Sequence, residues 1–210
     1  MTSADIAYEF KGALYLNITN ECSSACVFCI KRKWEMKFEG HDLNLRGAEP
    51  SAGEVLAAVS EKFAAKKYSE LVFCGYGEPT MRFELLKSVC GKIRAGKAEN
   101  VDPGIRIRLN TNGLGNLVNG RDIVPELEGL VDSLNVSLNS LDPEQWLKLM
   151  NPAAVYRDAG FKSVLEFIVS AGKKAGEVVV TAVQRDDVDL KKIGDFSLKN
   201  GVQFRLRPSL

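Results

Sequence analysis

Strand-like and helix-like segments alternate along the whole of this 210-residue chain. Short apolar segments typical of strands occur at residues 14–19, 71–74, 105–109, 133–138, 178–183 and 204–207. Helical periodicity lies between them, at 51–65, 83–94, 122–130, about 143–174 with a break near Asn151-Pro152, and 190–199. Residues 31–50 show no clear period and are predicted to form a long loop. Because alternating strands and helices build βα units, the pattern predicts an α/β fold with six parallel strands.

Most of the predicted strands have one apolar and one polar face. In the third strand Ile107 and Leu109 share a face, and Arg108 and Asn110 share the other. A closed eight-stranded barrel fills its interior with apolar side chains, and a doubly wound sheet buries both faces. The polar faces therefore predict a curved, incompletely closed sheet whose concave side holds a polar ligand. A sheet with one face in water is the alternative.

Composition narrows the class of protein. With 45% apolar residues, the chain can bury a sizeable core, and we expect one domain over residues 1–210. The 28 basic and 27 acidic residues give a net charge of +1, which favours small-molecule partners and no nucleic acid. No apolar stretch approaches the roughly 20 residues that cross a bilayer. We therefore expect a cytoplasmic protein without a membrane partner.

Three of the five cysteines, Cys22, Cys26 and Cys29, follow the first strand in one tight loop. This clustering favours a metal site in a reducing compartment over disulfides. A zinc site that adds His41, the sole histidine, is one option, although a long polar gap separates it from the thiols. A [4Fe-4S] cluster suits the compact loop better, and three thiolates leave one iron open for a substrate or cofactor.

The pattern Cys22-x3-Cys26-x-Phe28-Cys29 resembles the signature of the radical S-adenosylmethionine (SAM) superfamily. The resemblance implies that the three cysteines hold a [4Fe-4S] cluster and that the open iron binds the amino and carboxylate groups of SAM. It also implies that Phe28 lies near the adenine. The fold it implies is a partial, open (βα)6 barrel with parallel strands.

Further motifs follow later strands, where ligands bind in α/β sheets. The segment Gly75-Tyr76-Gly77-Glu78-Pro79 is similar to the family's Gly-Gly-Glu motif, which takes the methionine amino group of SAM. Residues 110–113 resemble a segment that contacts SAM, and a pair after the fourth strand resembles one that contacts the ribose. Each motif alone could be turn chemistry. The SAM-binding residues implied are Phe28, Gly75, Gly77, Glu78, Asn110, Asn112, Ser137 and Asn139.

The resemblance is closest to the short TatD-associated radical SAM proteins, on the segments LYLNITN, FCGYGEP, NTNG and FRLRP. We associate this group with a queuine lyase activity, which releases a 7-deazaguanine base from queuine. The implied reaction is reductive cleavage of SAM to methionine and a 5′-deoxyadenosyl radical, which takes a hydrogen atom from the substrate. The implied electron donor is a flavodoxin or a ferredoxin.

Substrate contacts are expected from polar groups that SAM does not use. Arg205 and Arg207 on the last strand have forked donors suited to a carboxylate or a heterocycle's carbonyls, although a solvated surface pair is the alternative. The loop from Trp34 to Leu45 could fold over the site as a stacking lid, and an exposed loop histidine is the alternative for His41. The complete candidate set is Tyr15, Asn17, Trp34, His41, Gln203, Arg205 and Arg207.

Two other functions stay open at this point. The chain ends just after the sixth predicted strand, so we expect no domain with an auxiliary cluster, and a small substrate rather than peptide maturation. Generation of a glycyl radical on a partner protein would use the same chemistry. A non-catalytic iron-sulfur or zinc protein would use the thiols for structure or electron transfer.

Overall fold

A seven-stranded open sheet forms the centre of the protein. The computed structural model describes residues 4–33 and 35–208. The strand order is β1-β2-β5-β6-β7-β8-β9, and neighbours from β2 onward are parallel. The strands are β1 (Ala7–Phe10), β2 (Ala13–Leu16), β5 (Glu70–Phe73), β6 (Arg106–Thr111), β7 (Ser133–Ser137), β8 (Glu177–Val183) and β9 (Gln203–Arg207). The open, parallel (βα)6 arrangement is confirmed, because β1 and β9 are separate edges of the sheet.

Strand β1 was not predicted, and it pairs antiparallel with β2. The connecting residues Lys11 and Gly12 both have positive φ, 50° and 79°. A two-residue turn with two positive φ values matches the twist of a tight β-hairpin. The short segment gains its strand structure from this pairing, so its own four residues carried little signal.

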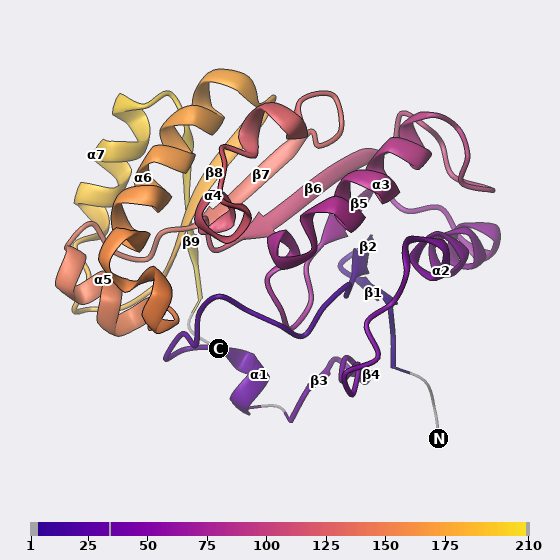
Figure 1. The fold of residues 1–210 in the computed structure, drawn as a ribbon, viewed down its shortest axis with the longest axis horizontal. Coiled ribbons are helices and arrows are strands. Elements are labelled where there is room, and N and C mark those ends of the chain that lie inside the picture. Colours follow the sequence, from indigo (N-terminus) through magenta and orange to yellow (C-terminus); the bar gives the residue numbers. More distant parts are fainter. Residues whose placement is uncertain (1–3, 34, 209–210) are drawn as a thin grey trace.

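Helices follow the strands and cover the convex face of the sheet (Figure 1). They are α2 (Ala52–Ala65), α3 (Phe83–Arg94), α4 (Gly115–Asn119), α5 (Pro143–Met150), α6 (Arg157–Lys174) and α7 (Leu190–Lys199), with 3₁₀ turns η1 (Pro79–Arg82), η2 (Val124–Leu127) and η3 (Ala154–Tyr156). Helix α2 begins with a capping box, since Ser51 and Glu54 bond to each other's backbone. None of the helices in the described part of the chain is long and apolar enough to cross a membrane.

The predicted helix at 122–130 is wrong. The structure has only η2 there, with Pro125 in its first turn, and it places α4 just before. Proline cannot donate a backbone hydrogen bond, and the Asp122 carboxylate instead accepts the Val124 amide at 3.1 Å. Residues 115–127 therefore form a short α-helix and a 3₁₀ turn in place of the helix predicted at 122–130.

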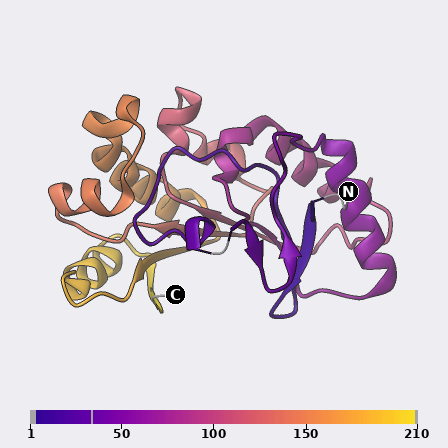
Figure 2. The same ribbon diagram turned by 90° about the horizontal axis from the view of Figure 1, so that it is seen from below.

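The predicted loop 31–50 contains α1 (Ile30–Lys33) and a small hairpin of β3 (Lys37–Phe38) and β4 (His41–Asp42). Figure 2 shows this part of the chain crossing in front of the sheet. Its apolar side chains join Tyr8 and Tyr76 in a second, smaller hydrophobic cluster. The hairpin is therefore fixed to the β1–β2 end of the molecule.

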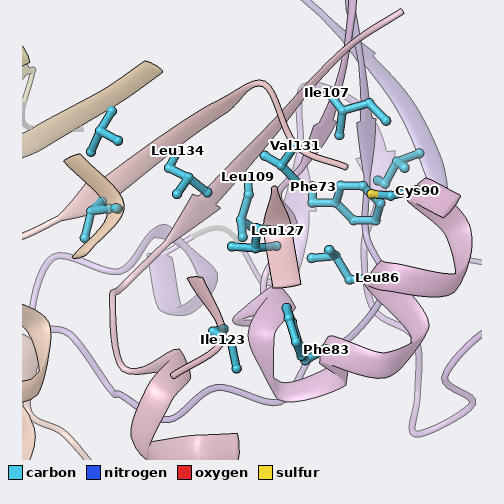
Figure 3. Close-up of a cluster of buried hydrophobic side chains, with 14 of the residues drawn as sticks. Phe73, Phe83, Leu86, Cys90, Ile107, Leu109, Ile123, Leu127, Val131 and Leu134 are labelled. Atoms are coloured by element: carbon cyan, nitrogen blue, oxygen red, sulfur yellow. The ribbon is translucent and has the colours of Figure 1, made fainter. Parts of the chain in front are cut away.

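The main core lies between the convex sheet face and the helices (Figure 3). Leu71 of β5 is level with Leu14 and Ile107 on its two neighbours, and all three are fully buried. Residues one step along each strand point to the opposite, concave face. There Arg108 is level with Ser133, so the concave face is polar as predicted.

Candidate active site

A cavity of about 270 Å³ opens at the carboxyl ends of the strands, on the concave side of the sheet. Side chains from the cysteine loop and from the ends of β5 to β9 line it. Of the residues predicted from sequence, the cavity is lined by Cys22, Cys26, Phe28, Cys29, Gly75, Gly77, Glu78, Asn110, Asn112, Ser137, Asn139, Arg205 and Arg207. All of the predicted cluster and SAM positions thus surround one space.

The cysteine loop is fixed from the far side by the end of α5. The Ala25 amide donates to the Asn151 carbonyl at 2.9 Å, and the Val27 amide donates to the Leu149 carbonyl at 3.0 Å. Asn151 ends α5 in the left-handed conformation, with φ 41°. The loop therefore has backbone partners on both sides of the thiol at Cys26, although little of it is regular structure.

The three thiols fit an iron-sulfur cluster better than a single ion. Within residues 4–33 and 35–208, no three His, Cys, Asp or Glu side chains converge closely enough for one metal ion. The thiolates of a [4Fe-4S] cluster bind separate irons and need not converge in that way. His41, the possible fourth zinc ligand, instead lies 3.4 Å from the Asp5 carboxylate. Burial raises the pKa of Cys26 to about 12, so binding a metal there releases a proton.

Glu78 connects two of the predicted motifs. Its side chain is buried and accepts from the Thr80 hydroxyl at 2.8 Å, the Thr111 hydroxyl at 2.8 Å and the Asn112 amide at 2.7 Å. Burial raises the pKa of this carboxyl group, while these hydrogen bonds oppose the rise. Of these three bonds only the one from the Asn112 amide falls on Oε2, so that oxygen retains acceptor capacity toward the cavity.

The glycines of this motif make room for the chain itself. A Cβ at Gly77 would lie 2.4 Å from the Thr19 carbonyl oxygen, and one at Gly75 would lie 2.2 Å from the Asn17 side chain. We expected the glycines to admit a ligand. In the structure both glycines line the cavity and also leave room for Asn17 and Thr19, which follow β2, and this close approach brings Glu78 against the cysteine loop.

The asparagines on the cavity wall also hold neighbouring segments in place. Asn112 donates to the Ser23 hydroxyl at 2.8 Å and so fixes the start of the cysteine loop. Asn139, with φ 64°, accepts the Val183 amide at 3.0 Å. In the described part of the chain the Ser137 hydroxyl has only a 3.4 Å contact from Arg207, so of these three wall residues it has the most unused hydrogen-bonding capacity.

The two arginines of β9 have different surroundings. With its amide oxygen toward the arginines, Asn135 accepts from Arg205 Nη2 at 2.9 Å and from Arg108 Nη1 at 2.9 Å. Arg207 is more deeply buried, and desolvation lowers its pKa. Its Nε is buried and has no hydrogen-bond partner among residues 4–33 and 35–208. The alternative of a solvated arginine pair is therefore wrong for Arg207.

Four expected substrate contacts lie away from this cavity. Asn17 is fully buried and donates to the Leu43 carbonyl at 2.9 Å, because β2 ends at Leu16 and the alternation of faces stops there. Tyr15 and His41 pack against Tyr8. Gln203 lines a second hollow of about 500 Å³ at the amino ends of the strands. Trp34 lies outside the described residues.

Several wall residues were missed. Cys74 follows β5, and Thr181 of β8 is level with Ser137. Met150 of α5 lies 3.9 Å from the Cys26 sulfur. Cys74 could have been predicted from the sequence, since it lies two residues after Val72 and therefore shares the concave face of the strand with it. Met150 could not, because its position depends on how α5 packs.

Comparison with known families identifies this arrangement. The family model described as the radical SAM superfamily matches residues 16–185. The chain belongs to the radical SAM superfamily. Members of this superfamily carry a [4Fe-4S] cluster and SAM, and they require a reductant and a substrate. The superfamily that the sequence motifs predicted is therefore confirmed.

Curated relatives of this radical SAM chain include enzymes named GTP 3′,8-cyclase. The enzyme of Pseudomonas entomophila (strain L48) is 30% identical over 179 residues, covering 79% of this chain and 47% of the relative. The enzyme of Corynebacterium glutamicum (strain R) is 26% identical over 197 residues, covering 91% of this chain and 47% of the relative. The chain thus spans about half the length of the curated relatives it matches.

Solved structures with the same fold include SuiB of Streptococcus suis. The complex with precursor peptide SuiA gives a TM-score of 0.68 at 15% identity, over 97% of this chain and 40% of that one. The complex of SuiB with SAM gives a TM-score of 0.62 at 14% identity, over 93% of this chain and 38% of that one. These similarities support the partial-barrel fold of the radical SAM chain.

Proposed function

We propose that this radical SAM enzyme acts on a small molecule built on a purine or 7-deazapurine ring. The observation that supports it is that the three cysteines and all eight predicted SAM-contact positions line one cavity. Two kinds of similarity suggest the ring. Four sequence segments resemble those of a group that we associate with queuine lyase activity, and the curated relatives are named GTP 3′,8-cyclases.

In this proposal Cys22, Cys26 and Cys29 hold the cluster. When bound, the cluster and SAM supply hydrogen-atom abstraction from an otherwise unreactive carbon. Glu78 Oε2 accepts from the ammonium group of SAM, and Ser137 donates to or accepts from its ribose hydroxyls. Water is kept from the reacting carbon by Phe28 and Met150, which supply apolar wall on the cysteine-loop side.

The same proposal includes the location of the enzyme, its electron donor and its product. Residues 1–210 form a single catalytic domain in the cytoplasm, where thiols stay reduced. A flavodoxin or ferredoxin supplies the electron. The product depends on the substrate: a lyase reaction releases a smaller base from queuine, whereas a cyclase reaction forms a new ring within GTP.

The first experiment is anaerobic reconstitution with iron and sulfide, followed by SAM and dithionite. We expect a [4Fe-4S] absorption band and release of 5′-deoxyadenosine, and we expect Cys26→Ala to abolish both. Cys90→Ala is the matched control, because Cys90 is a fully buried thiol of α3 that lies away from the cavity. A full cluster without SAM cleavage, alone or with either substrate, would instead indicate a non-catalytic iron-sulfur protein.

The second experiment tests the substrate. Queuine or GTP is incubated with the reconstituted enzyme, SAM and reductant, and the products are separated by mass. A smaller deazapurine from queuine supports the lyase reaction, and a cyclised nucleotide supports the cyclase reaction. If both compounds remain unchanged while SAM is cleaved, the purine-like substrate is wrong.

A further inference from the structure

Arg207 is a half-buried cation with incomplete hydrogen bonding. Among the described residues its buried Nε has no partner, and its Nη2 reaches only the Ser137 hydroxyl at 3.4 Å and the Asn139 side-chain oxygen at 3.5 Å. Both contacts are near the upper limit for a hydrogen bond. A guanidinium offers five donors in a planar fork, so most of this capacity is unused.

Two other arginines on the concave face, Arg106 and Arg108, have acidic partners. Arg108 donates to both carboxylate oxygens of Glu70, at 2.7 and 3.2 Å, and Arg106 pairs with Glu177. Arg205 has the Asn135 amide, and its charge acts on Glu177. Within the described part of the chain, no ion pair joins Arg207 to a carboxylate.

This difference matters because an unpaired charge is costly to bury. Removing a cation from water without a counter-ion carries a penalty of several kcal/mol in proteins. The ionisable groups that act on Arg207 are Cys74, Cys26 and Arg205, none of which is a carboxylate. An anion bound in the cavity would offset that penalty and fill the unused donors.

We propose that Arg207 binds an oxyanion, a carboxylate or a phosphate, of a small molecule held in this cavity. The inference rests on the proposed function and narrows its substrate. The oxyanion has two possible sources, the carboxylate of SAM or an acidic group of the substrate. Of the two substrates considered above, GTP carries such a group and queuine does not. If the oxyanion belongs to the substrate, the substrate is therefore a nucleotide.

The test measures binding to reconstituted, unreduced protein, in which no turnover occurs. Four probes are titrated: SAM, decarboxylated SAM, GTP and guanosine. We expect Arg207→Gln to weaken binding of the probe whose oxyanion it holds by roughly ten- to a hundredfold, and to leave binding of the counterpart that lacks this oxyanion unchanged. If Arg207→Gln loses affinity for SAM alone, the oxyanion is the carboxylate of SAM. If it loses affinity for GTP alone, the oxyanion is a phosphate of GTP. Unchanged affinities for both SAM and GTP overturn the inference.

A second measurement separates binding from structure. Because Arg207 has no ion pair to lose, ligand-free Arg207→Gln should unfold at the same urea concentration as the wild type or at a higher one. Arg94→Gln is the matched control, because Arg94 bonds to Asp132 at 2.6 Å and to the Ile105 carbonyl at 2.7 Å. It should unfold at a lower concentration. If Arg207→Gln is destabilised as much as Arg94→Gln, Arg207 is structural and the inference fails.

The two proposals can fail separately. If the wild type cleaves SAM under dithionite while Arg207→Gln binds every probe normally, only the oxyanion site is wrong. If the wild type binds the probes as expected but never cleaves SAM, the enzymatic proposal is wrong and the binding site stands.

Discussion

At the scale of single residues, Gly77 has almost no room for a side chain. Its missing Cβ would lie 2.4 Å from the Thr19 carbonyl oxygen and 2.5 Å from that of Glu21. We expect Gly77→Ala to lower the free energy of unfolding by about 1–3 kcal/mol, since backbone must move to admit the methyl group. Urea denaturation measures the change.

The control for this substitution is Gly91→Ala. Gly91 lies inside α3, and nothing is within 4 Å of its Cβ position. Alanine there should raise the free energy of unfolding by about 0.5–1 kcal/mol, because it favours the helix. Equal effects at the two positions would contradict the close packing of Gly77 against the backbone of Thr19 and Glu21.

Sequence predicted the residues of the site where chemistry restricts the choice. Three thiols in one loop and Glu78 after a glycine pair needed no knowledge of packing, and the structure places all four on one cavity. The predicted position of Asn17 in the cavity was not found, because the alternation of faces holds only within a strand and β2 ends one residue before Asn17. Whether an arginine has a partner is also decided by packing, so the isolation of Arg207 was not predictable.

At the scale of elements, a cluster of charges joins α3 to η2. Arg121 Nε bonds to Glu126 at 2.7 Å, its Nη2 bonds to Glu84 at 2.6 Å, and Lys87 contacts both glutamates. Hydrogen bonds from Arg121 and Lys87 lower the pKa of Glu126 from 4.5 to about 2. The carboxylate is thus favoured in the folded protein.

This cluster predicts a defined pH dependence. Because the folded pKa of Glu126 lies below the unfolded value, its stabilisation is present above about pH 4.5 and is lost as the pH falls toward 2. We expect Glu126→Gln to be less stable than the wild type at pH 7, by an amount that vanishes near pH 2 and shrinks in high salt. Denaturation at several pH values checks this. A difference that is constant with pH would exclude the charge cluster as its cause.

Elements with strong local signals were predicted to the residue. The predicted helices 83–94 and 190–199 match α3 and α7, where apolar spacing and length agree with a helix. Elements that depend on a partner were missed. Strand β1 requires β2 beside it, and the β3–β4 hairpin is fixed by Tyr8 and Tyr76, which are distant in sequence.

At the scale of the whole molecule, the cysteine loop is held by residues that come much later in the chain. The Ala25 and Val27 amides bond to Asn151 and Leu149. We expect these two amides to exchange slowly with deuterium even without a cluster. Asn151→Ala, which strains a left-handed position, should speed their exchange, whereas Asn151→Gly should not. Fast exchange of both amides in the wild-type apoprotein would show that the loop is not anchored.

The same anchoring has a consequence for biosynthesis. The thiols leave the ribosome more than a hundred residues before Asn151, which at typical rates of synthesis is a delay on the order of ten seconds. During that interval the nascent chain carries three closely spaced thiols without the segment that fixes their geometry. Delivery of iron and sulfide to this protein is therefore expected to follow translation of the α5 segment, and oxidants that pair thiols are expected to harm the newly made chain more than the finished one.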